Sequence, residues 1–153
     1  MARRFWSALF VLTLASIAAG AEPGVKVQFA GGTVAGISPK EGARLDLTAT
    51  ESLTIQSGHT SIQIPYQKVN TVEYGQSVSR RYAEAVLLSP VFLLAKSRRH
   101  FVTLGYVDAD GKQQALVFRV EKGDIRSVLA ALEARTGRRV EYQDQEARKA
   151  GKG

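Results

Sequence analysis

The residue types that most often carry out catalysis are scarce in this chain of 153 residues, which has two histidines and no cysteine. His59 follows Gly58 in a polar turn, and His100 follows a basic cluster. Neither lies near a Gly-x-Ser-x-Gly or a His-Glu-x-x-His motif, so each is interpreted as a surface residue rather than as a catalytic base. The lack of cysteine excludes disulfide bonds, thiol catalysis and Cys-ligated zinc within this sequence.

The acidic residues give no clearer sign of a reactive site. Asp108, Asp110 and Gly111 partly match a calcium-binding loop, but the glutamate that such a loop needs would fall at Val117. The same residues are typical of a tight hairpin turn. Glu73, at a strand end, is the one candidate for a buried acid and is interpreted as a solvated strand terminus. The sequence therefore predicts no catalytic residue, no metal site and no cofactor.

The most unusual stretch is an insert at 77–99, in which the uncharged run 85–95 is flanked by basic residues. The run is too short to span a bilayer, and Pro90 interrupts any helix within it. One interpretation is that the insert folds over a sheet and completes the core. The other is that it contacts a membrane or a partner, with its basic flanks at anionic groups. The candidate contact residues are Arg80, Arg81, Leu87, Leu88, Val91, Phe92, Leu93, Lys96, Arg98 and Arg99.

The elements that must position this insert are predicted to be strands followed by one helix. Apolar and polar residues alternate over short segments, as in strands with one buried face, and Pro65 ends one of them. The apolar positions 125, 128, 129 and 132 form one stripe of a helix that Asp124 caps and Gly137 ends. The predicted strands cover 25–37 with a glycine bulge, 44–48, 52–56, 61–64, 71–74, 100–107 and 113–121, with a short extended piece at 138–142.

This order of elements favours a mainly β fold with one C-terminal helix, in the α+β class. A curled sheet of short strands leaves an apolar opening, which a helix with a single apolar stripe can cover. We therefore expect a small curled antiparallel barrel or sandwich capped by the helix. Residues 143–153 are polar and are predicted to form a disordered tail.

The strand and turn patterns resemble those of pleckstrin-homology-like domains, and the bacterial and GRAM-like members most closely. The resemblance rests on 42–48, on Leu53-Thr54-Ile55, on Ile62-Gln63-Ile64-Pro65-Tyr66 and on Val72-Glu73-Tyr74-Gly75. It covers about residues 25–142, and the hairpin at Asp110-Gly111 and the later helix occupy the expected positions. The resemblance implies a noncatalytic interaction scaffold; the insert is a departure from the family pattern.

The first 21 residues are ordered like a secretory signal peptide. Arg3-Arg4 precede the uncharged run Phe5–Ala21, whose end, Ala19-Gly20-Ala21, suits a signal peptidase. We expect cleavage after Ala21 and an exported protein, periplasmic or secreted; the alternative is a retained N-terminal membrane anchor. Loss of Arg3 and Arg4 would lower the formal net charge from +7 to +5.

These features predict an exported domain at 22–142 that docks onto an unknown protein or an anionic membrane surface and is not an enzyme. Scattered positive charge and an exported location disfavour nucleic acid as a partner. The alternative is a small exported ligand carrier, or an enzyme whose site is not visible in the sequence.

Overall fold

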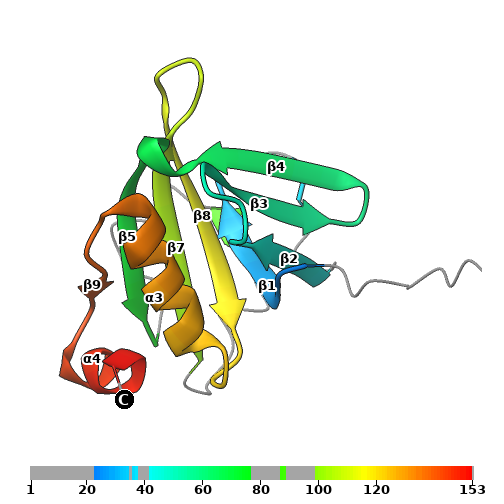
Figure 1. Ribbon diagram of the computed structural model, residues 1–153. Helices are drawn as coiled ribbons and strands as arrows, with labels where there is room; N and C mark the ends of the chain where they lie inside the picture. The colour runs from blue at the N-terminus through cyan, green and yellow to red at the C-terminus, as the bar shows by residue number, and fades with distance from the viewer. Residues whose placement is uncertain (1–22, 35, 38–41, 77–86, 89–98, 153) are drawn as a thin grey trace, which may run out of the picture.

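The computed structural model describes residues 23–34, 36–37, 42–76, 87–88 and 99–152 (Figure 1). It has a mainly β fold of the α+β class, so the predicted fold class is confirmed. The strands are β1 (Val25–Gly32), β2 (Gly42–Asp46), β3 (Ser52–Ser57), β4 (Thr60–Pro65), β5 (Val69–Gly75), β6 (Leu87–Leu88), β7 (His100–Val107), β8 (Gln113–Val120) and β9 (Glu141–Tyr142). The helices are the 3-10 turn η1 (Tyr66–Lys68), α3 (Ile125–Thr136) and α4 (Gln145–Lys152).

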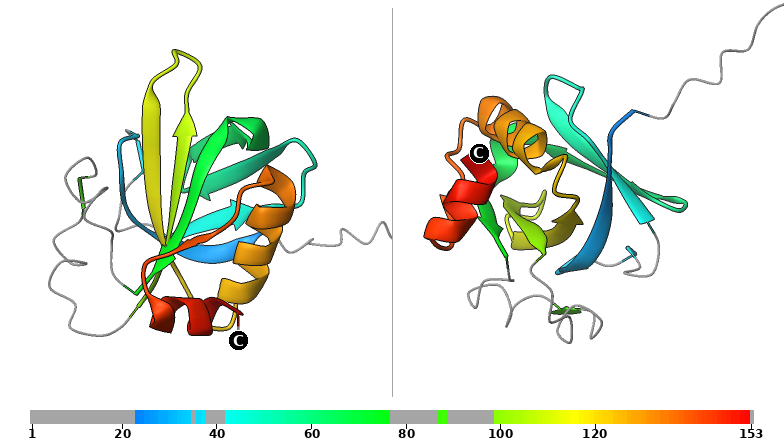
Figure 2. Two further views of the ribbon diagram at one scale, coloured as in Figure 1. Left: turned by 90° about the vertical axis from the view of Figure 1, so that its left-hand side faces the viewer. Right: turned by 90° about the horizontal axis from the view of Figure 1, so that it is seen from below.

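The sheet is open and mixed rather than a closed antiparallel barrel. In the described part of the chain its strands run in the order β4-β3-β2-β1-β8-β7-β5-β9, and β6 pairs with β1. The pairings among β1–β8 are antiparallel, as predicted, and the one departure is the two-residue β9, which lies parallel to β5. A parallel partner is possible here because α3 intervenes and returns the chain before β9 begins. The sheet is curled, and α3 lies against its concave side (Figure 2).

Strand β1 carries the predicted bulge, because its register with β8 shifts between Phe29 and Gly31. It ends at Gly32, earlier than the predicted end at Ile37. A Cβ atom at Gly32 would lie 2.9 Å from the carbonyl oxygen of Ala115, so glycine allows β1 to approach β8 this closely.

Large apolar side chains fill the concave side of the sheet. The alternating residues of β2, β3 and β4 point inward as predicted, and Leu45, Ile55 and Ile64 are each no more than 1% exposed. In the other half, Phe118 packs against Phe29 with ring centroids 5.9 Å apart. These side chains form one continuous core with α3.

Helix α3 covers this core with the predicted stripe, since Ile125, Val128, Leu129 and Leu132 are all buried. Gly137 ends the helix in the left-handed conformation, with φ of 66°. The predicted side-chain cap was wrong: Asp124 has helical backbone angles and its carboxylate makes no capping hydrogen bond. Instead, the Ser127 hydroxyl donates to the Asp124 carbonyl oxygen at 2.8 Å.

The prediction of a disordered tail over 143–153 was also wrong, because residues Gln145–Lys152 form α4. The buried residues of α4 include Ala147 and Gly151. A Cβ atom at Gly151 would lie 2.7 Å from Cε1 of Tyr142, so the helix docks through small residues that carry little hydropathy signal. None of the helices in the described ranges is long and apolar enough to cross a membrane.

Candidate functional site

The insert begins and ends at neighbouring points on one end of the sheet. Gly75, near the end of β5, is paired with Phe101, near the start of β7. The chain therefore leaves the described sheet at Gln76 and returns at Arg99 within a short distance, at the lower end of the view in Figure 1. Both flanks of the apolar run 85–95 are joined to this end, which we call the insert end of the sheet.

The candidate contact residues are only partly placed by the structure. Leu87 and Leu88 form β6, whose backbone pairs with Gly32 and Gly31 of β1. Arg99 is half-buried next to the start of β7. Neither interpretation of the insert, as core or as contact surface, is decided by these placements. The remaining candidates, Arg80, Arg81, Val91, Phe92, Leu93, Lys96 and Arg98, lie outside the described residues.

Basic residues of other elements lie at the insert end. Strand β8 ends there, since Val120 pairs with His100, and exposed Lys122 follows. Lys122 is close enough to His100 to contribute to lowering the pKa of its imidazole. Neighbouring Glu121 lies 3.5 Å from the Arg119 guanidinium, which offsets part of its negative charge. Exposed Arg126 lies in the first turn of α3, next along the chain.

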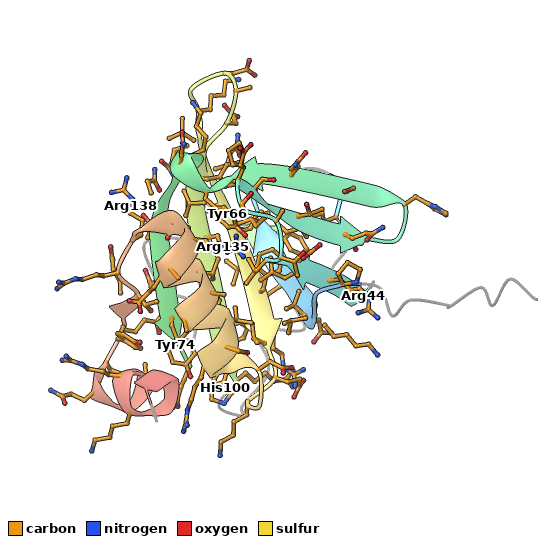
Figure 3. All side chains as sticks on the ribbon, viewed as in Figure 1. Arg44, Tyr66, Tyr74, His100, Arg135 and Arg138 are labelled. Atoms are coloured by element: carbon orange, nitrogen blue, oxygen red, sulfur yellow. The ribbon has the colours of Figure 1, made fainter. Side chains whose placement is uncertain are left out.

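An aromatic cluster supports the insert end from within. The Tyr74 hydroxyl is hydrogen-bonded to Nδ1 of His100, and the two rings are stacked with an interplanar angle of 6°. Tyr142 of β9 meets Tyr74 edge-on, with ring centroids 6.1 Å apart. His100 is therefore a partly buried member of a cluster rather than a fully exposed side chain (Figure 3).

Burial raises the pKa of the Tyr74 phenol, and the nearby Tyr142 and Asp144 act in the same direction. For His100, burial is the main cause of a pKa below its ordinary value of 6.5; Lys122 lowers it further and Glu121 opposes the shift. Burial acts against the charged form in both residues, which identifies the cluster as a partly dehydrated patch.

Glu73 is the clearest residue that sequence reasoning misjudged. Its side chain is 4% exposed, and Nε2 of Gln143 donates a hydrogen bond to its Oε1 at 2.9 Å. The Gln143 backbone N–H also donates to the carbonyl oxygen of Tyr74 at 3.1 Å. These contacts come from the chain after β9, more than sixty residues later, so no local pattern around Glu73 could have revealed them.

A separate open cleft of about 500 Å³, which we call the outer cleft, lies between α3, β9 and α4, outside the core that α3 covers. Its walls carry charges of both signs together with one aromatic ring and one valine. One wall is fixed by Glu133, whose Oε1 accepts a hydrogen bond from the Val140 backbone N–H at 2.8 Å. The lining residues are Glu133, Arg139, Val140, Tyr142, Asp144, Gln145 and Arg148.

The Asp108–Gly111 turn is a hairpin, as predicted. Oδ1 of Asp108 accepts hydrogen bonds from the backbone N–H groups of Asp110 and Lys112, and Oδ2 accepts one from Nε2 of Gln114. The Gln114 bond is the largest cause of a lowered Asp108 pKa, with the backbone bond from Lys112 next. Among the described residues, no group of three His, Cys, Asp or Glu side chains is arranged to hold a metal ion.

The lowered pKa of His100 predicts that the stability of the fold depends on pH. Because its folded pKa lies below 6.5, the unfolded chain binds the proton more readily, and protonation favours unfolding. The free energy of unfolding should therefore fall as the pH drops below about 6.5. Urea unfolding between about pH 5 and pH 7 should show a smaller slope in His100→Asn, with His59→Asn as the control. An unchanged slope in His100→Asn would contradict this.

Comparisons of the chain with models of protein families, with curated proteins and with solved structures each found no match.

Proposed function

We propose that the chain is an exported, noncatalytic interaction module with a pleckstrin-homology-like scaffold, which docks on an anionic membrane surface through the insert end of the sheet. The observation that carries the proposal is the common origin of the insert's two flanks. Gln76 and Arg99 lie at the ends of paired strands, beside Lys122 and Arg126. The two flanks of the apolar run and a set of cations therefore start from the same end of the domain. Within the run, Leu87 and Leu88 pair with β1 further along the sheet, where β1 lies opposite Leu116 and Val117 of β8.

The order of elements supports the scaffold. Consecutive hairpin strands are followed by the hairpin at Asp110-Gly111 and then by α3, the positions that the resemblance implies. Helix α3 covers the concave face of the sheet, as a capping helix of such a domain would. A rigid support of this kind suits a binding surface, because loops anchored on paired strands keep their position at little cost in entropy.

Electrostatics favour an anionic surface as the target. A basic residue near such a surface contributes about 1 kcal/mol to binding. Arg99, Lys122 and Arg126 are in the described part of the insert end, and the sequence of the insert adds four further cations. Apolar residues next to cations are the combination that membrane-surface segments use, because one part enters the acyl boundary while the other stays at the phosphates.

The charge at the insert end can be tested with two matched lysines. Lys112 precedes β8 and Lys122 follows it, so they lie at opposite ends of one strand and both are exposed. We expect Lys122→Glu to weaken binding to phosphatidylglycerol vesicles fivefold or more, and Lys112→Glu to change it little. Co-sedimentation at low and high salt measures both, since screening should weaken the electrostatic part. Equal losses in the two variants would argue against a specific insert end.

The apolar part of the proposal needs its own variant. Leu87→Ser combined with Phe92→Ser removes apolar surface from the insert and leaves its charges intact. We expect this double variant no longer to co-sediment with anionic vesicles. Its melting temperature is the control that shows whether the variant is folded. Binding by the folded double variant equal to that of the unmodified chain would remove the membrane from consideration.

The outer cleft between α3, β9 and α4 supports a second candidate, a small-ligand carrier. Its volume of about 500 Å³ is within the range of small-molecule sites, although its walls are polar. The core side of the sheet is filled, so a ligand would bind outside it. Thermal shift against lipids, sugars and metal ions tests this, since a ligand that binds only the folded state raises the melting temperature.

A further inference from the structure

Strand β4 forms one end of the sheet, and no described strand pairs with its outer side. At its first residue, the Thr60 hydroxyl donates to the carbonyl oxygen of Gly36 at 3.1 Å. The strand pairs with β3 over six residues without a register shift, from Thr60 opposite Ser57 to Pro65 opposite Ser52. In the strand order it has no second neighbour among the described strands. Figure 1 shows it along the upper right margin of the sheet, away from the insert end.

The tight hairpin fixes which backbone groups of β4 point outward. Gly58 and His59 form a two-residue turn, with Gly58 in a positive-φ conformation at 54°. In such a hairpin the closing pair exchanges both hydrogen bonds, and bonded residues then alternate along the ladder. Thr60, Ile62 and Ile64 therefore bond to β3, which leaves the N–H and C=O groups of Ser61 and Gln63 directed away from it.

This edge lacks most of the devices that keep sheet edges from pairing. Natural edge strands carry charges, bulges or proline for that purpose. No Asp, Glu, Lys or Arg occurs between Glu51 and Lys68, and β4 has no bulge. Pro65 blocks pairing only at the end of the strand, and the exposed Ser61 and Gln63 are small or neutral. As far as the described residues show, the backbone groups of Ser61 and Gln63 are therefore available to another extended strand.

We propose that the strand which pairs here is β4 of a second copy of this chain, in an antiparallel, two-fold symmetric dimer centred on Ile62. In this register Ser61 faces Gln63 of the second copy, and each of the two pairs exchanges two backbone hydrogen bonds. A register centred on Gln63 would instead place Ser61 opposite proline, which has no N–H to donate. Of these two registers, the one centred on Ile62 therefore lets the outward N–H and C=O groups of Ser61 and Gln63 pair fully with those of the second copy.

The side chain at the centre supports the same arrangement. Ile62 is only partly buried, although it packs against the core. In the dimer it meets Ile62 of the second copy in a non-hydrogen-bonded pair, where side chains approach most closely. Each copy would cover the exposed part of the other's isoleucine and extend the apolar layer across the junction. The paired segment is short, so we expect a weak, concentration-dependent dimer below the size of a standard interface.

The absence of cysteine allows a direct test by disulfide trapping in the protein purified from expressing cells. Ile62→Cys should form a covalent dimer under mild oxidation at about 100 μM protein, because directly opposed residues satisfy disulfide geometry. Ser61→Cys is the matched control, since its symmetry-related Cα atoms would be more than about 7 Å apart. Cross-linking of Ser61→Cys in preference to Ile62→Cys, or of neither, overturns the proposed register.

A second pair of variants tests the dimer without cross-linking and keeps Ile62 unchanged. Ser61→Lys with Gln63→Lys places lysines opposite each other in both pairs and should abolish the dimer. Ser61→Lys with Gln63→Glu places opposite charges there and should retain it. Sedimentation velocity over a range of concentrations measures both. The proposal is overturned if the unmodified chain is monomeric at all concentrations, which is also the result expected if a strand of another protein is the natural partner. It is overturned as well if the chain dimerises and neither pair of substitutions changes the dimer.

Discussion

Replacement of Leu129 by aspartate is expected to abolish cooperative folding of the domain. Leu129 is 2% exposed and belongs to the stripe with which α3 covers the concave face. The change removes apolar burial worth about 2–5 kcal/mol and places a carboxylate without a designed partner in the core, which costs several kcal/mol more. Since small domains are stable by only about 5–15 kcal/mol, the sum is comparable to the whole stability. Circular dichroism and thermal melting provide the measurement.

The neighbouring residue gives a matched control for this experiment. Ala130 is exposed on the same helix, so Ala130→Asp introduces the same charge with only a helix-propensity cost of under about 1 kcal/mol. We expect Ala130→Asp to melt within a few degrees of the unmodified chain. Similar losses in both variants would mean that charge in α3, rather than burial of its stripe, determines stability, and the capping role of the helix would be wrong.

Polar contacts explain why α3 has one position over the sheet. Nη1 and Nη2 of Arg135 donate to the carbonyl oxygens of Ala49 and Thr48, at 2.9 and 3.2 Å. Nε of Arg138 donates to the carbonyl oxygen of Val69 at 3.3 Å. The C-terminal end of the helix is thus tied both to the β2–β3 turn and to the start of β5, on the two halves of the curled sheet (Figure 3).

Local patterns predicted the strands and α3 because their signals lie within each segment. Alternation along β2, β3 and β4 reflects one face against the core, and the predicted limits of β7 agree with the structure. The helix end at Gly137 was predicted for the same reason, since the left-handed conformation depends on that residue alone. The order of these predicted strands and of the helix was enough to predict the fold class.

The errors concern residues whose surroundings come from distant parts of the chain. Glu73 is the clearest case, because the side chain that bonds to its carboxylate, Gln143, comes from beyond β9. The hydrogen bond between Tyr74 and His100 likewise joins two separate strands. The parallel pairing of Glu73 with Glu141 and of Tyr74 with Tyr142 generates this environment. The extended piece predicted at 138–142 contains β9, but a two-residue strand has no periodicity of its own that could show which strand it pairs with.

The second large effect is expected at α4, where sequence reasoning failed most completely. Ala147→Asp would place a carboxylate at a position that is fully buried against the rest of the fold. Desolvation of that group is expected to cost about 2 kcal/mol or more, which exceeds what one short docked helix can offset. Helix α4 should therefore leave the sheet while α3 and the core remain folded. Hydrogen exchange of 145–152 should accelerate strongly, with a smaller fall in melting temperature.

Gln145→Asp is the control for that experiment, because residue 145 is exposed in the first turn of the same helix and a carboxylate there is favourable. It should leave hydrogen exchange in α4 unchanged.

Undocking of α4 should also uncover the aromatic cluster, since Gly151 lies against Tyr142 and Tyr74. In Ala147→Asp the pKa of His100 should then rise toward 6.5, because burial is the main cause of its shift. Proton NMR titration of His100 measures this, and an unchanged pKa together with rapid exchange in α4 would show that α4 contributes nothing to the burial of the cluster.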